Sequence, residues 1–96
     1  MPIAFLTVEL RIEGAASLKD KRQVLRSMKD RLRAKFNVSV SELDPSDLWQ
    51  RATIGVVSIS GSRDYLDGLM ANVQREVGRI ANSTGAEVVD AFVEIL

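Results

Sequence analysis

The chain has neither cysteine nor histidine among its 96 residues. Without cysteine there can be no disulfide, thiol nucleophile, iron–sulfur cluster or thiolate zinc site. Without histidine the chain lacks the commonest general base and the commonest metal ligand. Any catalysis would have to rest on Asp, Glu, Lys, Arg, Ser, Thr or Tyr. We expect no catalytic residues, no metal and no cofactor, and these absences favour a protein that is not an enzyme.

Long apolar runs are also missing. The longest uninterrupted run is Ile3 to Leu6, whereas a membrane-spanning helix needs about 20 apolar residues. The N-terminus lacks the basic region, long apolar stretch and small-residue cleavage site of a signal peptide. The sequence thus predicts a cytoplasmic protein with no membrane partner. Its length is that of one domain, which we place at residues 1–96.

Apolar residues alternate with polar ones at the start of the chain. In "IAFLTVELRIE" every second residue from Ala4 to Ile12 is apolar, which is typical of a half-buried strand. Four strands are predicted, at residues 3–13, 37–43, 51–60 and 86–96. The third is apolar on both faces, as a central strand would be. In the last strand, the side chains of Val89, Ala91, Val93 and Ile95 are predicted to point to the same face, toward the core.

Between these strands, apolar residues recur at helical spacing in two segments, which predicts two helices. Ser17 can cap a first helix that runs to about Lys35, with Asp20 as a short capping-box partner. Ser62 can cap a second helix, and Gly85 fits just past its end.

The resulting order, βαββαβ, predicts an α+β fold of the ferredoxin-like type. Right-handed crossovers would place both helices on one face of a four-stranded antiparallel sheet. The expected strand order is 4-1-3-2.

Positive charge is concentrated in residues 17–36, although the whole chain has no net charge. This segment holds eight basic and two acidic residues, and the remainder holds five basic and eleven acidic ones. Five basic residues recur at helical spacing of three and four and fall within an arc of about 80°. We call them the basic stripe: Lys19, Arg22, Arg26, Lys29 and Arg33. The stripe is about 21 Å long, which suits several phosphates of a nucleic-acid backbone.

Local helix stability does not favour this arrangement. Like charges three and four positions apart repel one another, and basic residues in the first turn oppose the helix dipole. Either carboxylates elsewhere in the fold neutralise the stripe, or an external anion does, and the sequence leaves both open. Lys21 falls nearer the apolar face, where its ammonium can find a partner.

The segment "ELDPSDLWQRA" contains the only tryptophan. We expect "DPSD" at 44–47 to form a turn, with Trp49 covering the edge of the sheet. Alternatively, Trp49 and Arg51 form a stacking pair for a nucleotide or a partner protein. Three known sites are excluded: the sequence lacks the RNA-recognition signature, the Walker pattern and the dinucleotide glycine motif.

Two of these segments, S-L-K-x-K-R and D-L-W-Q-R-A, resemble the YlxP-like family of small bacterial proteins, and the resemblance covers essentially the whole chain. The matching residues are Ser17, Leu18, Lys19, Lys21, Arg22, Asp47, Leu48, Trp49, Gln50 and Arg51. The resemblance implies a ferredoxin-like fold and provides no catalytic residues. Genes of the family often lie among those for transcription elongation, translation initiation and ribosome maturation factors, which implies an RNA- or ribosome-linked role.

The sequence therefore predicts a module that binds RNA or the ribosome through the phosphate backbone. The stripe would make the contacts, and Lys21, Trp49 and Arg51 would assist. The alternatives are a protein-interaction or dimerisation module whose stripe meets an acidic partner, and a small-molecule regulatory domain of the ACT type. The sequence is also compatible with a homodimer, and the partly apolar open face of the sheet is one surface that it could use.

Overall fold

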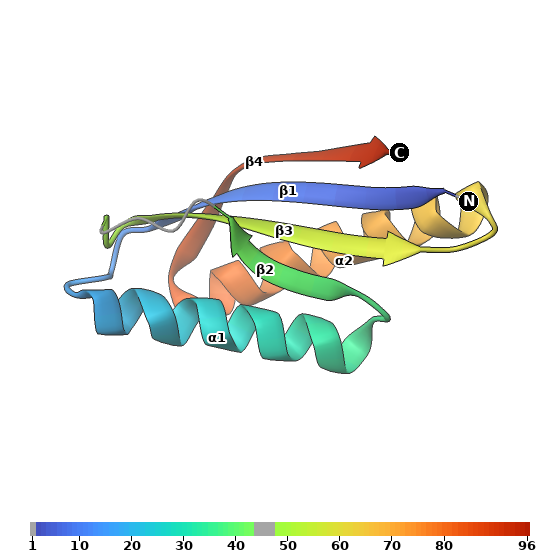
Figure 1. Ribbon diagram of the computed structural model, residues 1–96. Coiled ribbons are helices and arrows are strands. Elements are labelled where there is room, and N and C mark those ends of the chain that lie inside the picture. Colours follow the sequence, from blue (N-terminus) through green and yellow to red (C-terminus); the bar gives the residue numbers. More distant parts are fainter. Residues whose placement is uncertain (1, 44–47) are drawn as a thin grey trace.

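The computed structural model describes residues 2–43 and 48–96, so the turn predicted at 44–47 lies outside the described residues. Within them the elements follow the predicted order (Figure 1). They are β1 (Ile3–Ile12), α1 (Leu18–Lys35), β2 (Ser39–Leu43), β3 (Arg51–Ile59), α2 (Arg63–Thr84) and β4 (Ala86–Ile95).

The strands form one antiparallel sheet in the order β2-β3-β1-β4. Read from the other edge, this is the predicted order 4-1-3-2. Both helices lie on the same side of the sheet (Figure 1), which leaves the opposite side open. The fold is therefore ferredoxin-like, as predicted. Neither helix in the described part of the chain is both long and apolar enough to cross a membrane.

The core lies between the sheet and the two helices. From β1 the side chains of Leu6, Val8 and Leu10 point into it and are almost completely buried, and α2 contributes Leu66 and Val73. Because side chains alternate along a strand, the neighbouring residues of β1 lie on the open face of the sheet.

The predicted helix caps are confirmed. The hydroxyl of Ser17 accepts a hydrogen bond from the backbone N–H of Asp20 at 3.2 Å, and the Asp20 carboxylate accepts one from the N–H of Ala16 at 2.9 Å. Ser62 caps α2 in the same way. Gly85 ends α2 with a φ of 79°, a left-handed conformation that glycine adopts without strain.

The predicted face of β4 is wrong at one end. The pairing register shifts between Glu9 and Leu10, so that Leu10 lies opposite Val88. Val89 is the extra residue of a β-bulge and is exposed, while Val88 packs against the core. The inward set is therefore Val88, Ala91, Val93 and Ile95 in place of the predicted alternation.

Candidate nucleic-acid interface

The basic stripe lies along the flank of α1 that faces the edge strand β2. The guanidinium of Arg33 donates a hydrogen bond to the carbonyl oxygen of Val40 on β2 at 3.0 Å. The opposite flank of α1 faces α2, where Arg31 donates to the hydroxyl of Ser83 at 3.3 Å. The five residues of the stripe therefore share one side of the helix, as their spacing predicts.

Among the described residues, no nearby carboxylate neutralises the stripe. In the part of the chain that the structure describes, none of its five residues has a carboxylate oxygen within 4.0 Å of a side-chain nitrogen. Four of the five are exposed, and Lys29 is half-buried. The question that the sequence left open is answered for residues 2–43 and 48–96: the stripe presents its charge to solvent.

Lys21 does not belong with the stripe. Its side chain is only 4% exposed, and its ammonium lies 3.6 Å from the Glu42 carboxylate and 2.9 Å from the Leu48 carbonyl oxygen, to which it donates a hydrogen bond. The predicted role of Lys21 in contacting phosphate is therefore corrected. A buried ammonium that already meets a carboxylate holds the fold together at this point and is closed to an external anion.

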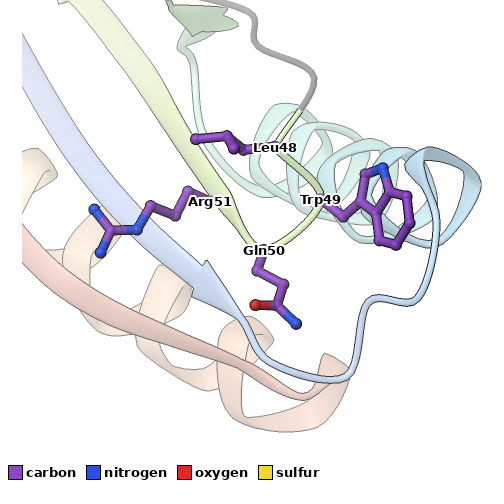
Figure 2. A pocket seen from close by; sticks show the side chains of 4 residues that line it. All are labelled: Leu48, Trp49, Gln50 and Arg51. Atoms are coloured by element: carbon purple, nitrogen blue, oxygen red, sulfur yellow. The ribbon is translucent and has the colours of Figure 1, made fainter.

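Arg51 lies on the wrong face to act with the stripe. It is opposite Arg11 in the β1–β3 pair, and Arg11 alternates with the buried Leu10 and Ile12. Arg51 is therefore on the open face of the sheet, away from α1. Figure 2 shows the Trp49 and Arg51 side chains pointing away from each other, so the predicted stacking pair is not formed.

Trp49 lies at the end of the molecule where α1 begins, and it is 49% exposed. The expectation that it covers the edge of the sheet is therefore only partly met, since half of the side chain remains accessible. Residues 48–51 line an open hollow of about 420 Å³ (Figure 2).

Negative charge gathers on the open face of the sheet, opposite the helices. Glu9 is paired with Asp90 across β1 and β4, and Phe5 is paired with Glu94. Arg11 and Arg51 on the same face balance part of this negative charge, and Arg11 lies 3.9 Å from carboxylate oxygens of both Glu13 and Glu87. The helix layer carries the stripe, so the neutral chain is still electrically polar. A polyanion would meet the helix layer first.

Glu76 on α2 is the acid that pairs with the other flank of α1. Its Oε2 lies 2.8 Å from the Lys35 ammonium and 3.4 Å from the guanidinium of Arg79, and its side chain is 14% exposed. The hydrogen bond from Lys35, followed by the positive charges of Lys35, Arg79 and Arg31, holds the pKa of Glu76 below its ordinary value, and burial opposes this only in part.

The sequence alone does not indicate that Glu42 and Glu76 are the partners of Lys21 and Lys35. Both pairs join separate elements, and no spacing along the chain signals them. The one usable signal was the position of Lys21 near the apolar face of α1. Within the described residues, no group of three or more acidic side chains is placed to hold a metal ion.

The fold and the stripe define the class of this protein as a ferredoxin-like α+β domain with an exposed basic helix flank. Residues 3–92 match the model of a family described as "Protein of unknown function (DUF503)". The chain is also 37% identical over 93 residues to the uncharacterized protein YlxP of Bacillus subtilis (strain 168), covering 97% of this chain and 88% of that protein. The chain belongs to this family, which confirms the resemblance seen in the sequence.

Solved structures share the fold at low identity. A C-terminal segment of the alpha subunit of aIF2 from Pyrococcus abyssi matches with a TM-score of 0.53 and 15% identity, covering 97% of this chain. This chain spans 50% of that segment's length. The de novo designed protein Foldit4 matches with a TM-score of 0.54 and 10% identity over 98% of this chain and 96% of its own. These likenesses concern the fold alone.

Proposed function

We propose that this protein is a non-enzymatic, cytoplasmic module that binds structured RNA, including RNA of the ribosome, through the phosphate backbone. The observation that carries the proposal is the basic stripe: five cations on one flank of α1 with no carboxylate within 4.0 Å among the described residues. Like charges held this close destabilise a helix by a few tenths of a kcal/mol per pair. An external polyanion would relieve that repulsion.

The other basic residues of α1 make the contrast clear. Lys21 and Lys35 face the protein, and each has a carboxylate partner there. Arg31 has no such carboxylate but donates to the Ser83 hydroxyl on α2. Among the described residues, each basic residue of α1 outside the stripe thus has a side-chain partner on another element, and no residue of the stripe does. This division supports a stripe that binds an external anion, and the RNA-linked role implied by the family resemblance supports RNA as that anion.

Binding through phosphates is expected to depend on salt and to vary little with sequence. If four or five phosphates are neutralised, log K should fall with log salt with a slope of about −3 to −4.5. Fluorescence anisotropy with a labelled RNA hairpin at several salt concentrations measures this slope. In cells, tagged protein should sediment with ribosomal fractions at low salt and leave them at high salt. An affinity that does not change with salt would contradict the proposal.

The alternative ligand of the stripe is an acidic protein in place of RNA. A pull-down repeated after nuclease treatment distinguishes the two, because an RNA-mediated association is lost and a protein contact is kept. For the ACT-type alternative, a thermal-shift screen with amino acids and nucleotides applies. Stabilisation by one of these small molecules would favour that alternative over an RNA-binding module.

The open face of the sheet favours a second candidate, a homodimer. Ile3 lies opposite Ile59, Phe5 lies opposite Val57, and Phe92 extends this apolar area onto β4. Ile59 and Phe92 are each about half exposed, and contiguous exposed apolar patches commonly mark interfaces.

We propose a second copy of this chain as the occupant, because a two-fold interface sets identical patches against each other. The carboxylates on the same face make a nucleic-acid occupant unfavourable. Light scattering should show a dimer for the wild type and a monomer for Phe92→Glu. A monomeric wild type at high protein concentration would exclude this interface, without bearing on the basic stripe.

A further inference from the structure

We propose that the RNA bound by the stripe presents an unpaired base beside the bound phosphates, and that Trp49 stacks on this base. The inference rests on the proposed function and adds to it the class of RNA: single-stranded segments, loops or bulges rather than continuous duplex.

The backbone on either side of Trp49 is fixed to the entry of α1. On one side, the Leu48 carbonyl accepts the hydrogen bond from Lys21, in the first turns of α1, at 2.9 Å. On the other, the Gln50 carbonyl accepts one from the backbone N–H of Ile12, the last residue of β1, at 2.8 Å. Both donors flank the connection from β1 to α1, so Trp49 is held at the end of the molecule where that helix begins.

The same end carries the beginning of the stripe. Lys19 and Arg22 are close neighbours of Lys21 in the sequence, and both are exposed. Lys21 therefore supports the site without contacting RNA itself. Its hydrogen bond to Leu48 holds the segment that contains Trp49 against the turn of α1 that carries Lys19 and Arg22. An aromatic face and a pair of phosphate-binding groups are thereby brought to one end of α1.

The side chain of Trp49 is accessible in a way that suits stacking. It is 49% exposed, and Figure 2 shows the indole directed toward the connection before α1 and away from Arg51. The hollow that Trp49 and its neighbours line is open to solvent, so a ligand can approach the indole from outside. Proteins that bind single strands combine such aromatic platforms with a positively charged path for the backbone.

Duplex RNA does not satisfy this arrangement. Its bases are stacked within the helix and expose only their edges, whereas loops and single strands can turn a base outward onto an aromatic ring. The stripe alone would bind either form, since phosphates are common to both. Trp49 therefore supplies the preference for unpaired RNA, and the stripe supplies the affinity common to all RNA.

The experiment uses the intrinsic fluorescence of Trp49, which is the only tryptophan in the chain. The full chain is titrated with three RNA probes of equal length: a single strand, a hairpin with a loop, and a blunt duplex. We expect the single strand and the hairpin to quench the emission and the duplex to leave it nearly unchanged. Trp49→Ala should lower affinity for the single strand about 5- to 150-fold and change duplex affinity little.

Tyr65→Ala provides the matched control. Tyr65 is 53% exposed, so it is an aromatic residue as accessible as Trp49, but it lies in the first turn of α2. Its loss should leave the affinity for all three probes unchanged. Trp49→Phe keeps an aromatic face and should retain part of the preference. Circular dichroism verifies that each variant is folded, and the quenching of the wild type needs no variant at all.

The outcomes separate this inference from the proposed function. Salt-dependent binding with unchanged tryptophan emission, or equal losses for single strand and duplex in Trp49→Ala, would overturn the stacking role and leave the phosphate-binding role standing. Failure of the wild type to bind any of the three probes would overturn the proposed function itself.

Discussion

The ammonium of Lys21 donates a hydrogen bond to the carbonyl oxygen of Leu48 at 2.9 Å, although the two residues are 27 positions apart. Two residues before it, Lys19 is exposed and has no carboxylate within 4.0 Å among the described residues. Two lysines of one helical turn thus have different tasks. One connects α1 to the segment that enters β3, and the other belongs to the basic stripe.

Replacing each lysine by methionine should separate these tasks. Lys21→Met removes a charge-assisted hydrogen bond and leaves Glu42 without its ammonium, so unfolding in urea should show a loss of about 1.5–3 kcal/mol. Lys19→Met should change stability by less than about 0.5 kcal/mol and weaken RNA binding. If Lys21→Met has wild-type stability and Lys19→Met does not, the structural assignment of the two lysines is wrong.

Charge reversal within the stripe should reduce the salt dependence of RNA binding. In the triple variant Arg22→Glu, Arg26→Glu and Lys29→Glu, three phosphate contacts are lost, so the slope of log K against log salt should become shallower by about 2–3. Anisotropy titrations at several salt concentrations measure this change. Far-UV circular dichroism should show a helix content close to that of the wild type, since none of the three is completely buried.

A matched control variant has the same net charge as the triple variant of the stripe but leaves the stripe intact. Arg63→Glu, Arg75→Glu and Arg79→Glu reverse three exposed residues that lie on α2. This variant should keep the wild-type slope within experimental error. Equal losses in both triple variants would mean that net charge, rather than the stripe, governs binding.

Two glycines at the C-terminal part of α2 should respond in opposite directions to alanine. Gly85 has a φ of 79°, so Gly85→Ala should destabilise the fold by about 1–2 kcal/mol because its Cβ is strained in the left-handed conformation. Gly78 is exposed within α2, and a Cβ there would meet nothing within 4 Å. Gly78→Ala should therefore stabilise the protein by about 0.5–1 kcal/mol. Urea denaturation measures the free energy of unfolding of both variants. Changes of the same sign in the two variants would contradict this prediction.

The sequence predicts this fold well because its signals are local and agree with one another. Ser17 and Gly85 mark helix ends through hydrogen bonds and backbone angles confined to a few residues. The prediction fails at Val88 and Val89, because a β-bulge depends on how β4 pairs with β1. Strict alternation in one strand contains no information about an extra residue relative to its partner.

For the candidate site, the sequence predicts which residues share a flank of α1 but not what they meet. Helical periodicity groups the stripe correctly. It could not identify Glu42 as the partner of Lys21, because that contact joins α1 to β2. Nor could it separate Trp49 from Arg51, two positions apart, because Trp49 precedes β3 and does not follow the alternation of the strand.

The pairing of Glu76 with α1 should make stability depend on pH at the acidic end. Because the pKa of Glu76 is lowered in the folded protein, the folded state favours the carboxylate more than the unfolded chain does. The resulting stability is fully present above the ordinary value near 4.5 and is lost as the pH falls through the lower, folded-state pKa. Glu76→Gln removes this contribution, so its melting temperature should lie below that of the wild type at pH 7.

The gap between wild type and Glu76→Gln should close as the pH falls below about 4.5, because the wild-type side chain becomes protonated and then resembles glutamine. Thermal unfolding followed by circular dichroism at a series of pH values measures the gap. Asp67→Asn is the control: it removes an exposed carboxylate from the same helix, and its melting temperature should stay close to that of the wild type throughout. A gap for Glu76→Gln that is constant from neutral to acidic pH would show that Lys35 and Arg79 do not stabilise the fold through the charge of Glu76.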